Sequence, residues 1–277
     1  MLKIPQKFFA GSCFIFNFNE TNHPLKAMRY FAFLFFILIS VTAECQILNA
    51  ESLRKVTDTS GFSGSMSASF AVKRNVNNFL TIGSDIHIQY KMKDHLILFK
   101  NDVAFQKIEG ENFDNSLISH IRYNYRFHPR IAWEIFLQGQ YNKVNLIDFR
   151  GLVGTGPRVK LTTSEKYKFY LGLLAMYEHE NVTDGVTPTQ KDFRASTYLS
   201  FSLYPSDHVT LISTTYYQPR IDKFHDYRIS SMSSLLVDLF KNFALKTSYT
   251  FTYDVFPAVG IPNSQYDFST GITYSFD

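Results

Sequence analysis

The stretch YDFSTGITYSF, residues 266–276, decides the fold. Every second residue from Tyr266 to Phe276 is aromatic, Ile or Thr, whereas the residues between them are Asp267, Ser, Gly, Thr and Ser. Successive side chains of a β-strand point to opposite faces, so one face of this segment is uncharged and apolar and the other is polar. Such a pattern is typical of a strand that faces lipid on one side and a water-filled or polar interior on the other.

Twelve segments of the chain show the same alternation. Their uncharged faces hold 71 positions without Asp, Glu, Lys or Arg, whereas the 59 interleaved positions carry 15 charges. A Lys or Arg at the bilayer midplane costs ~2–4 kcal/mol, and a soluble sandwich would carry its charges on the outer face instead. The uncharged positions, in steps of two, are 62–72, 80–90, 97–105, 117–127, 133–141, 149–161, 167–177, 193–203, 209–217, 227–239, 243–253 and 266–276.

These segments predict an all-β fold, a single antiparallel up-and-down transmembrane β-barrel of about 12 strands. The connections between them alternate between short ones of 3 to 6 residues and long ones of 7 to 15 residues. Outer-membrane barrels have short periplasmic turns and longer extracellular loops, so we expect both chain ends on the periplasmic side. The long connections are 73–79, 106–116, 142–148, 178–192, 218–226 and 254–265.

The front of the chain predicts export. The apolar run at 30–41 is about half the ~20 residues that a spanning helix needs, and a positive charge precedes it while small residues follow it. This pattern is typical of a cleaved signal peptide, here Met28–Cys45, with cleavage after Ala43 or Cys45 and a start at Met1 or Met28. The expected order is an extension and signal at 1–45, a periplasmic lead-in at 46–61 and the barrel at 62–277, in a bacterial outer membrane.

Composition excludes several classes of protein. The chain is 45% hydrophobic and 17% aromatic, too apolar for a disordered protein. Its two cysteines cannot build a zinc cluster or a disulfide scaffold. A net charge of +4 is too small to indicate a nucleic-acid binder. We expect no cofactor, no metal and no catalytic residue.

Four blocks of the sequence resemble the YdiY-like outer-membrane proteins, domain of unknown function 481. They are HIRYNYRF (120–127), AWEIFLQGQYNK (132–143), RGLVGTGPRVKL (150–161) and STTYYQPRIDKFHDYRISS (213–231). The resemblance extends over nearly all of Gly61–Phe276 and implies a barrel in the outer membrane, without an activity. Barrels of this kind often end on an aromatic residue that the assembly machinery reads. We expect Tyr274 and Phe276 to serve this purpose, although Asp277 follows them.

The charged positions expected inside the barrel are the candidate site. Ten are basic and five are acidic, which favours a narrow channel that prefers anionic solutes. The other interpretation is that these side chains pair with one another and fill the bore. The basic residues are Arg122, Arg126, Arg150, Arg158, Lys160, Lys168, Arg194 and Arg228, with Lys100 and Lys246. The acidic residues are Asp85, Asp102, Glu134 and Asp238, with Asp267.

Other functions remain open from the sequence. The long loops at 106–116, 178–192 and 254–265 suit a cell-surface receptor or adhesion module. A lipid hydrolase needs an outward-facing Ser, His and Asn at fitting spacing, and we find no such set. Glu178, His179 and Glu180 offer weak metal ligands, but we expect them to form a solvated loop edge.

Overall fold

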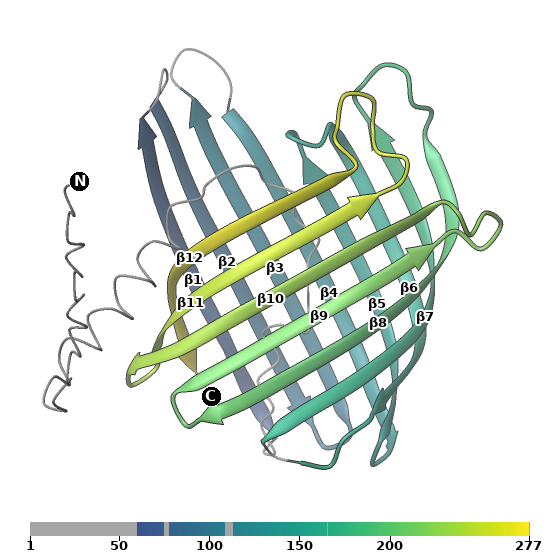
Figure 1. Cartoon of the computed structure of the whole chain (residues 1–277). Coiled ribbons are helices and arrows are strands. Elements are labelled where there is room, and N and C mark those ends of the chain that lie inside the picture. The colour runs from purple at the N-terminus through teal and green to yellow at the C-terminus, as the bar shows by residue number, and fades with distance from the viewer. Residues whose placement is uncertain (1–59, 75–77, 109–112, 165, 277) are drawn as a thin grey trace, which may run out of the picture. The chain divides into compact units, whose positions relative to one another are not determined.

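The computed structural model describes residues 60–74, 78–108, 113–164 and 166–276, and the expected signal peptide and nearly all of the lead-in lie outside them. Twelve strands form one closed barrel (Figure 1). They are β1 (Gly61–Arg74), β2 (Asn78–Met92), β3 (His95–Ile108), β4 (Phe113–His128), β5 (Ile131–Asn142), β6 (Ile147–Lys160), β7 (Tyr167–Val182), β8 (Gln190–Ser206), β9 (Val209–Pro219), β10 (Tyr227–Phe240), β11 (Phe243–Asp254) and β12 (Ser264–Phe276).

Each strand pairs antiparallel with its neighbours in the sequence, and β12 pairs with β1 to close the sheet. The closing ladder runs only from Gly64–Phe276 to Ala68–Ile272, whereas β1 pairs with β2 from Gly61 to Arg74. This ladder closes the sheet over its turn-end part, whereas the described loop-end parts of β1 and β12 are not paired with each other. The predicted fold, a closed twelve-stranded antiparallel barrel, is confirmed.

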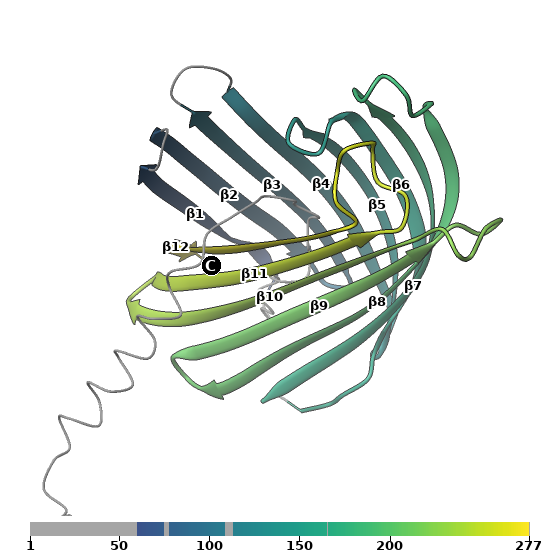
Figure 2. The same ribbon diagram turned by 45° about the horizontal axis from the view of Figure 1, so that its top comes forward.

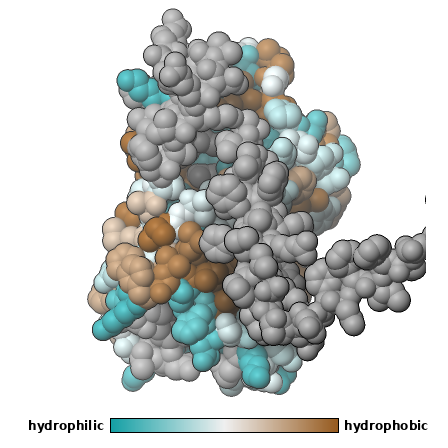
Figure 3. Space-filling model, turned by 60° about the vertical axis from the view of Figure 1, so that its left-hand side comes forward, coloured by the Kyte–Doolittle hydropathy of each residue, from teal (hydrophilic) through white to brown (hydrophobic). Residues whose placement is uncertain are grey.

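The alternation along each strand follows the expected parity. On β5, Leu137 is 54% exposed on the outer face, whereas Glu134 and Phe136 point into the bore and are buried. Brown hydrophobic side chains gather as a patch on the barrel face turned toward the viewer in Figure 3. An apolar outside and a polar inside are the arrangement that lipid imposes on a β-barrel. No helix among the described residues is long and apolar enough to cross a bilayer.

The two ends of the barrel differ in their connections. At the turn end, named for its tight hairpins, two-residue turns follow β2, β4, β8 and β10. Lys93 and Asn242 there have φ of 52° and 67°, the left-handed conformation that two-residue hairpin turns need. The loop end, at the opposite side, carries the connections at 143–146, 183–189, 220–226 and 255–263. The β11–β12 loop lies over the barrel mouth near β5 and β6 (Figure 2).

The expected strict separation of loop lengths is wrong. The loop-end connection at 143–146 has four residues, whereas the turn-end connection at 161–166 has six. The strands also continue beyond the charge-free segments, since β7 reaches Val182 and β8 begins at Gln190. Backbone pairing continues past the hydrocarbon layer because charges on the outer face cost only ~0–1 kcal/mol near the interfaces. The uncharged parity therefore marks the lipid-facing part of a strand rather than its whole length.

Candidate functional site

The inward side chains form an apolar layer and several groups of ion pairs, arranged along the bore. On each strand the residues of the parity opposite to the lipid-facing one turn inward, and antiparallel register then decides which of them meet. A charge in this interior is stable only when it is paired and hydrogen-bonded. Each group is therefore described by its buried carboxylates and the cations around them.

Glu178 on β7 is the centre of the largest group and is fully buried. Its Oε1 accepts a hydrogen bond from Nε of Arg150 on β6 at 2.5 Å. Its Oε2 accepts one from Nε of Arg194 on β8 at 2.6 Å. Arg228 on β10 also donates to Glu178 through Nη1. Three guanidinium groups from three strands thus surround one carboxylate.

Further carboxylates balance these arginines. Arg228 pairs with Glu180 through Nη2 at 2.9 Å and with Asp254 through Nε at 2.7 Å. Nη2 of Arg194 pairs with Asp226 at 3.1 Å. All five side chains are buried or half-buried. Buried arginines are tolerated because each shares more than one carboxylate.

Arg220, just beyond β9, extends the group toward the loops. Its Nη2 lies 3.2 Å from Asp192 and 2.8 Å from Asp222. The hydrogen bonds between Arg220 and Asp222 lower the pKa of Asp222 and raise the pKa of Arg220. We call the whole set the Glu178 cluster, of four arginines and six carboxylates: Arg150, Arg194, Arg220, Arg228, Glu178, Glu180, Asp192, Asp222, Asp226 and Asp254.

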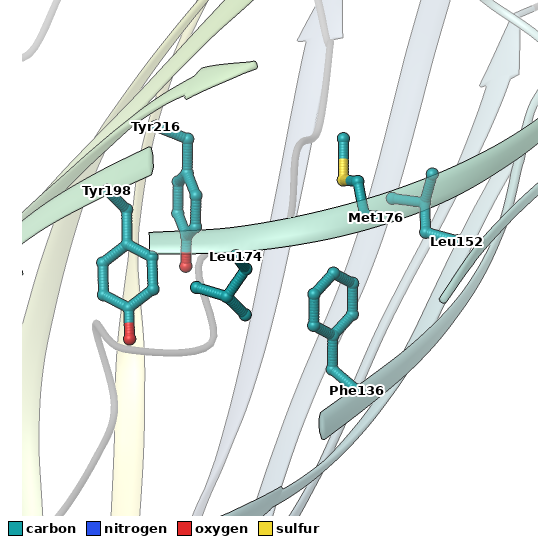
Figure 4. Packing of buried hydrophobic residues seen from close by; sticks show 6 residues of the cluster. All are labelled: Phe136, Leu152, Leu174, Met176, Tyr198 and Tyr216. Carbon is teal, nitrogen blue, oxygen red and sulfur yellow. The ribbon is translucent and has the colours of Figure 1, made fainter. Parts of the chain in front are cut away.

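An apolar layer lies next to the Glu178 cluster on the turn-end side (Figure 4). Two glycines make room for its rings, because a Cβ on Gly172 would lie 2.0 Å from the ring of Tyr198, and one on Gly154 would lie 2.4 Å from the ring of Phe136. The layer blocks this side of the bore with close packing rather than with charge. Its six residues are Phe136, Leu152, Leu174, Met176, Tyr198 and Tyr216.

Glu134 on β5 is the buried centre of a second group. The hydroxyl of Tyr198 donates to Glu134 Oε2 at 2.7 Å. Nη1 of Arg122 and Nη1 of Arg158 each lie 3.6 Å from its carboxylate. The guanidinium of Arg158 also stacks over the ring of Tyr170, at 3.8 Å from the centroid. Two cations and a phenol therefore compensate one buried carboxylate.

A third group joins β2, β3 and β11. Nζ of Lys100 lies 3.0 Å from Asp102 and 3.3 Å from Asp85. Nζ of Lys246 on β11 reaches the same Oδ2 of Asp85 at 3.6 Å. Because β12 and β1 separate β11 from β2 in the sheet, the Lys246–Asp85 pair crosses the inside of the barrel closure.

The predicted basic residues are not one cluster. Arg126 lies at the turn end, half exposed, with Nη2 at 2.9 Å from Asp94. Lys160 ends β6 at the same end, and Lys168 lies over the ring of Tyr204 at 5.6 Å. The others divide between the Glu178 cluster (Arg150, Arg194, Arg228), the Glu134 group (Arg122, Arg158) and the group around Asp85 (Lys100, Lys246). Of the predicted acidic residues, Asp238 is exposed at the turn end and Asp267 is half-buried on β12.

The expectation of a solvated loop edge at 178–180 is wrong. Glu178 and Glu180 are buried inward on β7, and His179 between them faces outward. The inward parity of 168–176 continues through 178 and 180, and following it past 177 would have found both carboxylates. The same continuation finds Asp192 on β8 and Asp254 on β11.

In the described part of the chain, the residues of the lipid-hydrolase alternative and of the metal-site alternative are not assembled. No group of three or more His, Cys, Asp or Glu is placed to hold a metal ion among the described residues. Outward-facing Asn101 donates to Ser119 Oγ at 2.7 Å, but His179 lies three strands away through Gly139 and Gly151. At about 4.8 Å per strand, the serine and the imidazole are roughly 14 Å apart, too far for proton transfer.

Two cavities in the bore are small. One, beneath the β11–β12 loop and beside Arg150 and Arg228, has a volume of about 50 Å³. The other, between the apolar layer and Arg122, has a volume of about 30 Å³. Cavities of this size hold a few water molecules.

The fold resembles solved outer-membrane proteins. An outer-membrane channel of the COG4313 group from Pseudomonas putida F1 has a TM-score of 0.51 and 8% sequence identity, covering 83% of this chain and all of that one. The NanC porin has a TM-score of 0.49 at 7% identity, with 78% of this chain and 100% of that chain covered. The KdgM porin, solved with disordered oligogalacturonate, has a TM-score of 0.44 at 10% identity, with 78% and 99% covered.

At these identities the likeness concerns the fold alone. No curated protein matches the sequence. A family model described as protein of unknown function, DUF481, matches residues 57–276. The match covers every strand of the barrel and all three ion-pair groups. The chain therefore belongs to the DUF481 family of outer-membrane β-barrel proteins.

Proposed function

We propose that the protein is a narrow, non-enzymatic channel of the outer membrane, with an anion preference set at the turn end. The observation that carries the proposal is a charge imbalance there. Within two residues of the turn-end strand termini, the described residues include nine basic side chains and three acidic ones. They are Lys91, Lys93, Arg126, Arg130, Arg158, Lys160, Lys166, Lys168 and Lys241, against Asp94, Asp207 and Asp238.

The loop end has no such basic excess. By the same criterion, the loop ends of β3 and β5–β12 hold five basic residues and six carboxylates among the residues whose side chains the structure describes. A mouth with an excess of one charge concentrates ions of the other sign and sets the selectivity of a narrow pore. The residues counted are Lys107, Lys143, Lys191, Arg220 and Arg228, against Asp148, Glu180, Asp184, Asp192, Asp226 and Asp254.

The path we infer runs along the closing side of the barrel. Most of the inward residues of β1 and β12 are small, and several keep solvent exposure, among them Ser69, Ser269 and Gly271. The opposite side holds the apolar layer and the Glu178 cluster, and the two cavities beside them have volumes of about 50 and 30 Å³. The Lys246–Asp85 pair narrows the path halfway along it.

The test is conductance of the purified full chain in planar bilayers under a KCl gradient. We expect small steps whose reversal potential indicates anion preference. The double variant Lys160→Glu, Lys166→Glu should lower that preference, whereas Lys223→Glu at the loop end should change it much less. Absence of conductance, or cation preference of the unaltered protein, would exclude the anion channel.

A cell-surface receptor is the second candidate, and exposed apolar loop residues favour it. Val186 is 73% exposed, Phe224 64%, Phe256 53% and Val259 58%, and all four lie in loop-end connections. Exposed apolar groups gathered at one end of a molecule are typical of a partner-binding surface. Deleting 183–189 should abolish binding of a partner to whole cells in a receptor, whereas it should leave conductance intact in a channel.

A further inference from the structure

A groove of about 560 Å³ lies on the outer wall of the barrel, across β4–β7. One row of paired residues forms its floor: Ser119 pairs with Gly139, Gly139 with Gly151, and Gly151 with His179. A second row of paired residues lines the flank toward the turn end; it consists of Phe99, Ile121, Leu137, Val153 and Tyr177. The groove is independent of the bore, because its floor residues have the lipid-facing parity.

The row continues beyond the groove at both ends. Beyond His179 it reaches Lys191 on β8, which is exposed and directly paired with His179. Beyond Ser119 it reaches Asn101 on β3, whose side-chain amide donates to Ser119 Oγ. Lys191 is the second residue of β8 at the loop end, whereas Asn101 is in the middle of β3. The row therefore descends from the loop-end rim toward the middle of the wall.

The row runs across the strands and descends into one lipid leaflet. Three strand-to-strand steps from His179 to Ser119 span about 14 Å across the strands. Strands of membrane barrels are tilted by ~40°, so the row descends by about 9 Å along the membrane normal, within the ~15 Å of half a hydrocarbon core. A groove that starts at a cationic rim and descends into this leaflet can hold the upper part of one acyl chain below its headgroup.

Packing within the barrel does not require glycine at position 139. A Cβ at Gly139 would meet no atom within 4 Å. Gly154 and Gly172 on the inward face differ, because a Cβ there would strike the rings of the apolar layer. Glycine in the middle of a strand costs stability, and its φ at 139 is not one that requires glycine. The effect of glycine at position 139 is therefore to keep this part of the groove open.

We propose that this groove binds a phosphate-bearing lipid of the bilayer leaflet at the loop end. One acyl chain lies over Gly139 and Gly151, and the phosphate meets the ammonium of Lys191 and the imidazole N–H of His179. Charge complementarity favours this occupant over a second copy of the barrel. The groove of a second copy has no acidic side chain among its described lining residues to pair with Lys191, whereas a lipid phosphate supplies a negative charge.

The test uses native mass spectrometry of the full chain in a neutral detergent, with phosphatidylglycerol or phosphatidylcholine added as the probe. We expect the unaltered protein to retain one phosphatidylglycerol in preference to phosphatidylcholine. Gly139→Leu should reduce that retention by about five-fold or more, because its side chain occupies the groove and its Cβ meets no atom within 4 Å. Lys191→Gln should remove the preference for phosphatidylglycerol.

Two controls separate the site from general effects. Ala68→Leu enlarges an exposed outward residue on β1, away from the groove, and should leave lipid retention unchanged. Because Gly139 faces outward, Gly139→Leu should also leave conductance unchanged, so failure of the channel proposal and failure of this one are distinguishable. Equal retention by Gly139→Leu and the unaltered protein would overturn the lipid site, as would dimers that Gly139→Leu dissociates.

Discussion

Arg194 Nε donates to Glu178 Oε2 at 2.6 Å, and both side chains are fully buried although β7 and β8 are the strands that carry one of the longest loops. The pair is the core of a network that extends from β6 to β11. Its carboxylates lie just beyond the lipid-facing part of their strands, and Arg150, Arg194 and Arg228 lie at the loop-end limit of that part. Order at the loop end of this barrel therefore depends on charge pairing as much as on backbone pairing.

Removing the charge of Glu178 should destabilise the barrel more than any other single neutralisation in the network. Glu178→Gln leaves Arg150, Arg194 and Arg228 without their shared carboxylate, and loss of one partner of a buried ion pair costs about 3–5 kcal/mol. Urea-induced unfolding in detergent, followed by tryptophan fluorescence, measures the change in the free energy of unfolding. Asp222→Asn, at the exposed edge of the same cluster, is the matched control and should change it by less than about 1 kcal/mol. Similar values for the two variants would contradict a central role for Glu178.

Substitution by alanine should affect stability differently at two glycines, Gly172 beside the apolar layer and Gly139 on the outer wall. Gly172→Ala places a Cβ against the ring of Tyr198, and overpacking of this kind costs about 1–3 kcal/mol. Gly139→Ala meets open space and should be neutral or slightly stabilising. The temperature at which each variant loses its compact band on a heat-modifiable electrophoresis gel compares them. A Gly172→Ala barrel as heat-resistant as Gly139→Ala would show that Tyr198 moves aside at no cost.

The free-energy cost of a charged side chain on the outer wall should depend on its depth in the membrane. Leu137 is 54% exposed near the middle of β5, so Leu137→Lys should cost ~2–4 kcal/mol in a bilayer. Leu161, also exposed but just past the turn end of β6, should accept Lys at a cost of ~0–1 kcal/mol. Folding into phospholipid vesicles at graded urea concentrations measures both. Equal costs at the two positions would be incompatible with a membrane that ends near the turn end.

A contact between two loops predicts a pH dependence. Asp184 in the β7–β8 loop accepts hydrogen bonds from the hydroxyl and amide of Thr187 and from the amide of Val259 in the β11–β12 loop, the last at 2.8 Å. The Thr187 bonds above all, with that from Val259, hold the pKa of Asp184 well below its ordinary value of 3.8. Because the pKa of Asp184 is lower in the folded protein, ionised Asp184 contributes fully to stability at pH values above its ordinary pKa. That contribution is lost only as the pH falls through the lower, folded-state pKa.

A spin label at Val186→Cys reports on this contact. Its mobility should stay constant from about pH 8 to about pH 5, since Asp184 remains ionised across that range. Asp184→Ala should make the label mobile throughout the range, whereas a label at Phe224→Cys in the β9–β10 loop should not respond to Asp184→Ala. Mobility that already rises between about pH 7 and about pH 5 would show that another group controls the contact.

The strand order, the closure and the outward parity could be predicted because they depend on local alternation. Lipid excludes charge from every second residue, so the pattern is readable one strand at a time, as at Leu137 and in 266–276. The pattern does not decide whether the bore is filled. It also predicts a loop edge at Glu178, because the lipid-facing positions end at 177, whereas β7 continues to Val182. Parity still marks it as inward, but it cannot show which cations are near.

The sequence by itself determined a barrel of twelve strands and which side of each strand faces lipid, because these follow from the two-residue period of a strand and the cost of a charge in hydrocarbon. Only the tertiary structure decided which inward side chains meet. Register between neighbouring strands places Arg150, Arg194 and Arg228 around Glu178, and it aligns Gly139 with Gly151 and His179 on the outer wall. A shift of one residue in any ladder would separate these groups while leaving the sequence pattern of every strand the same.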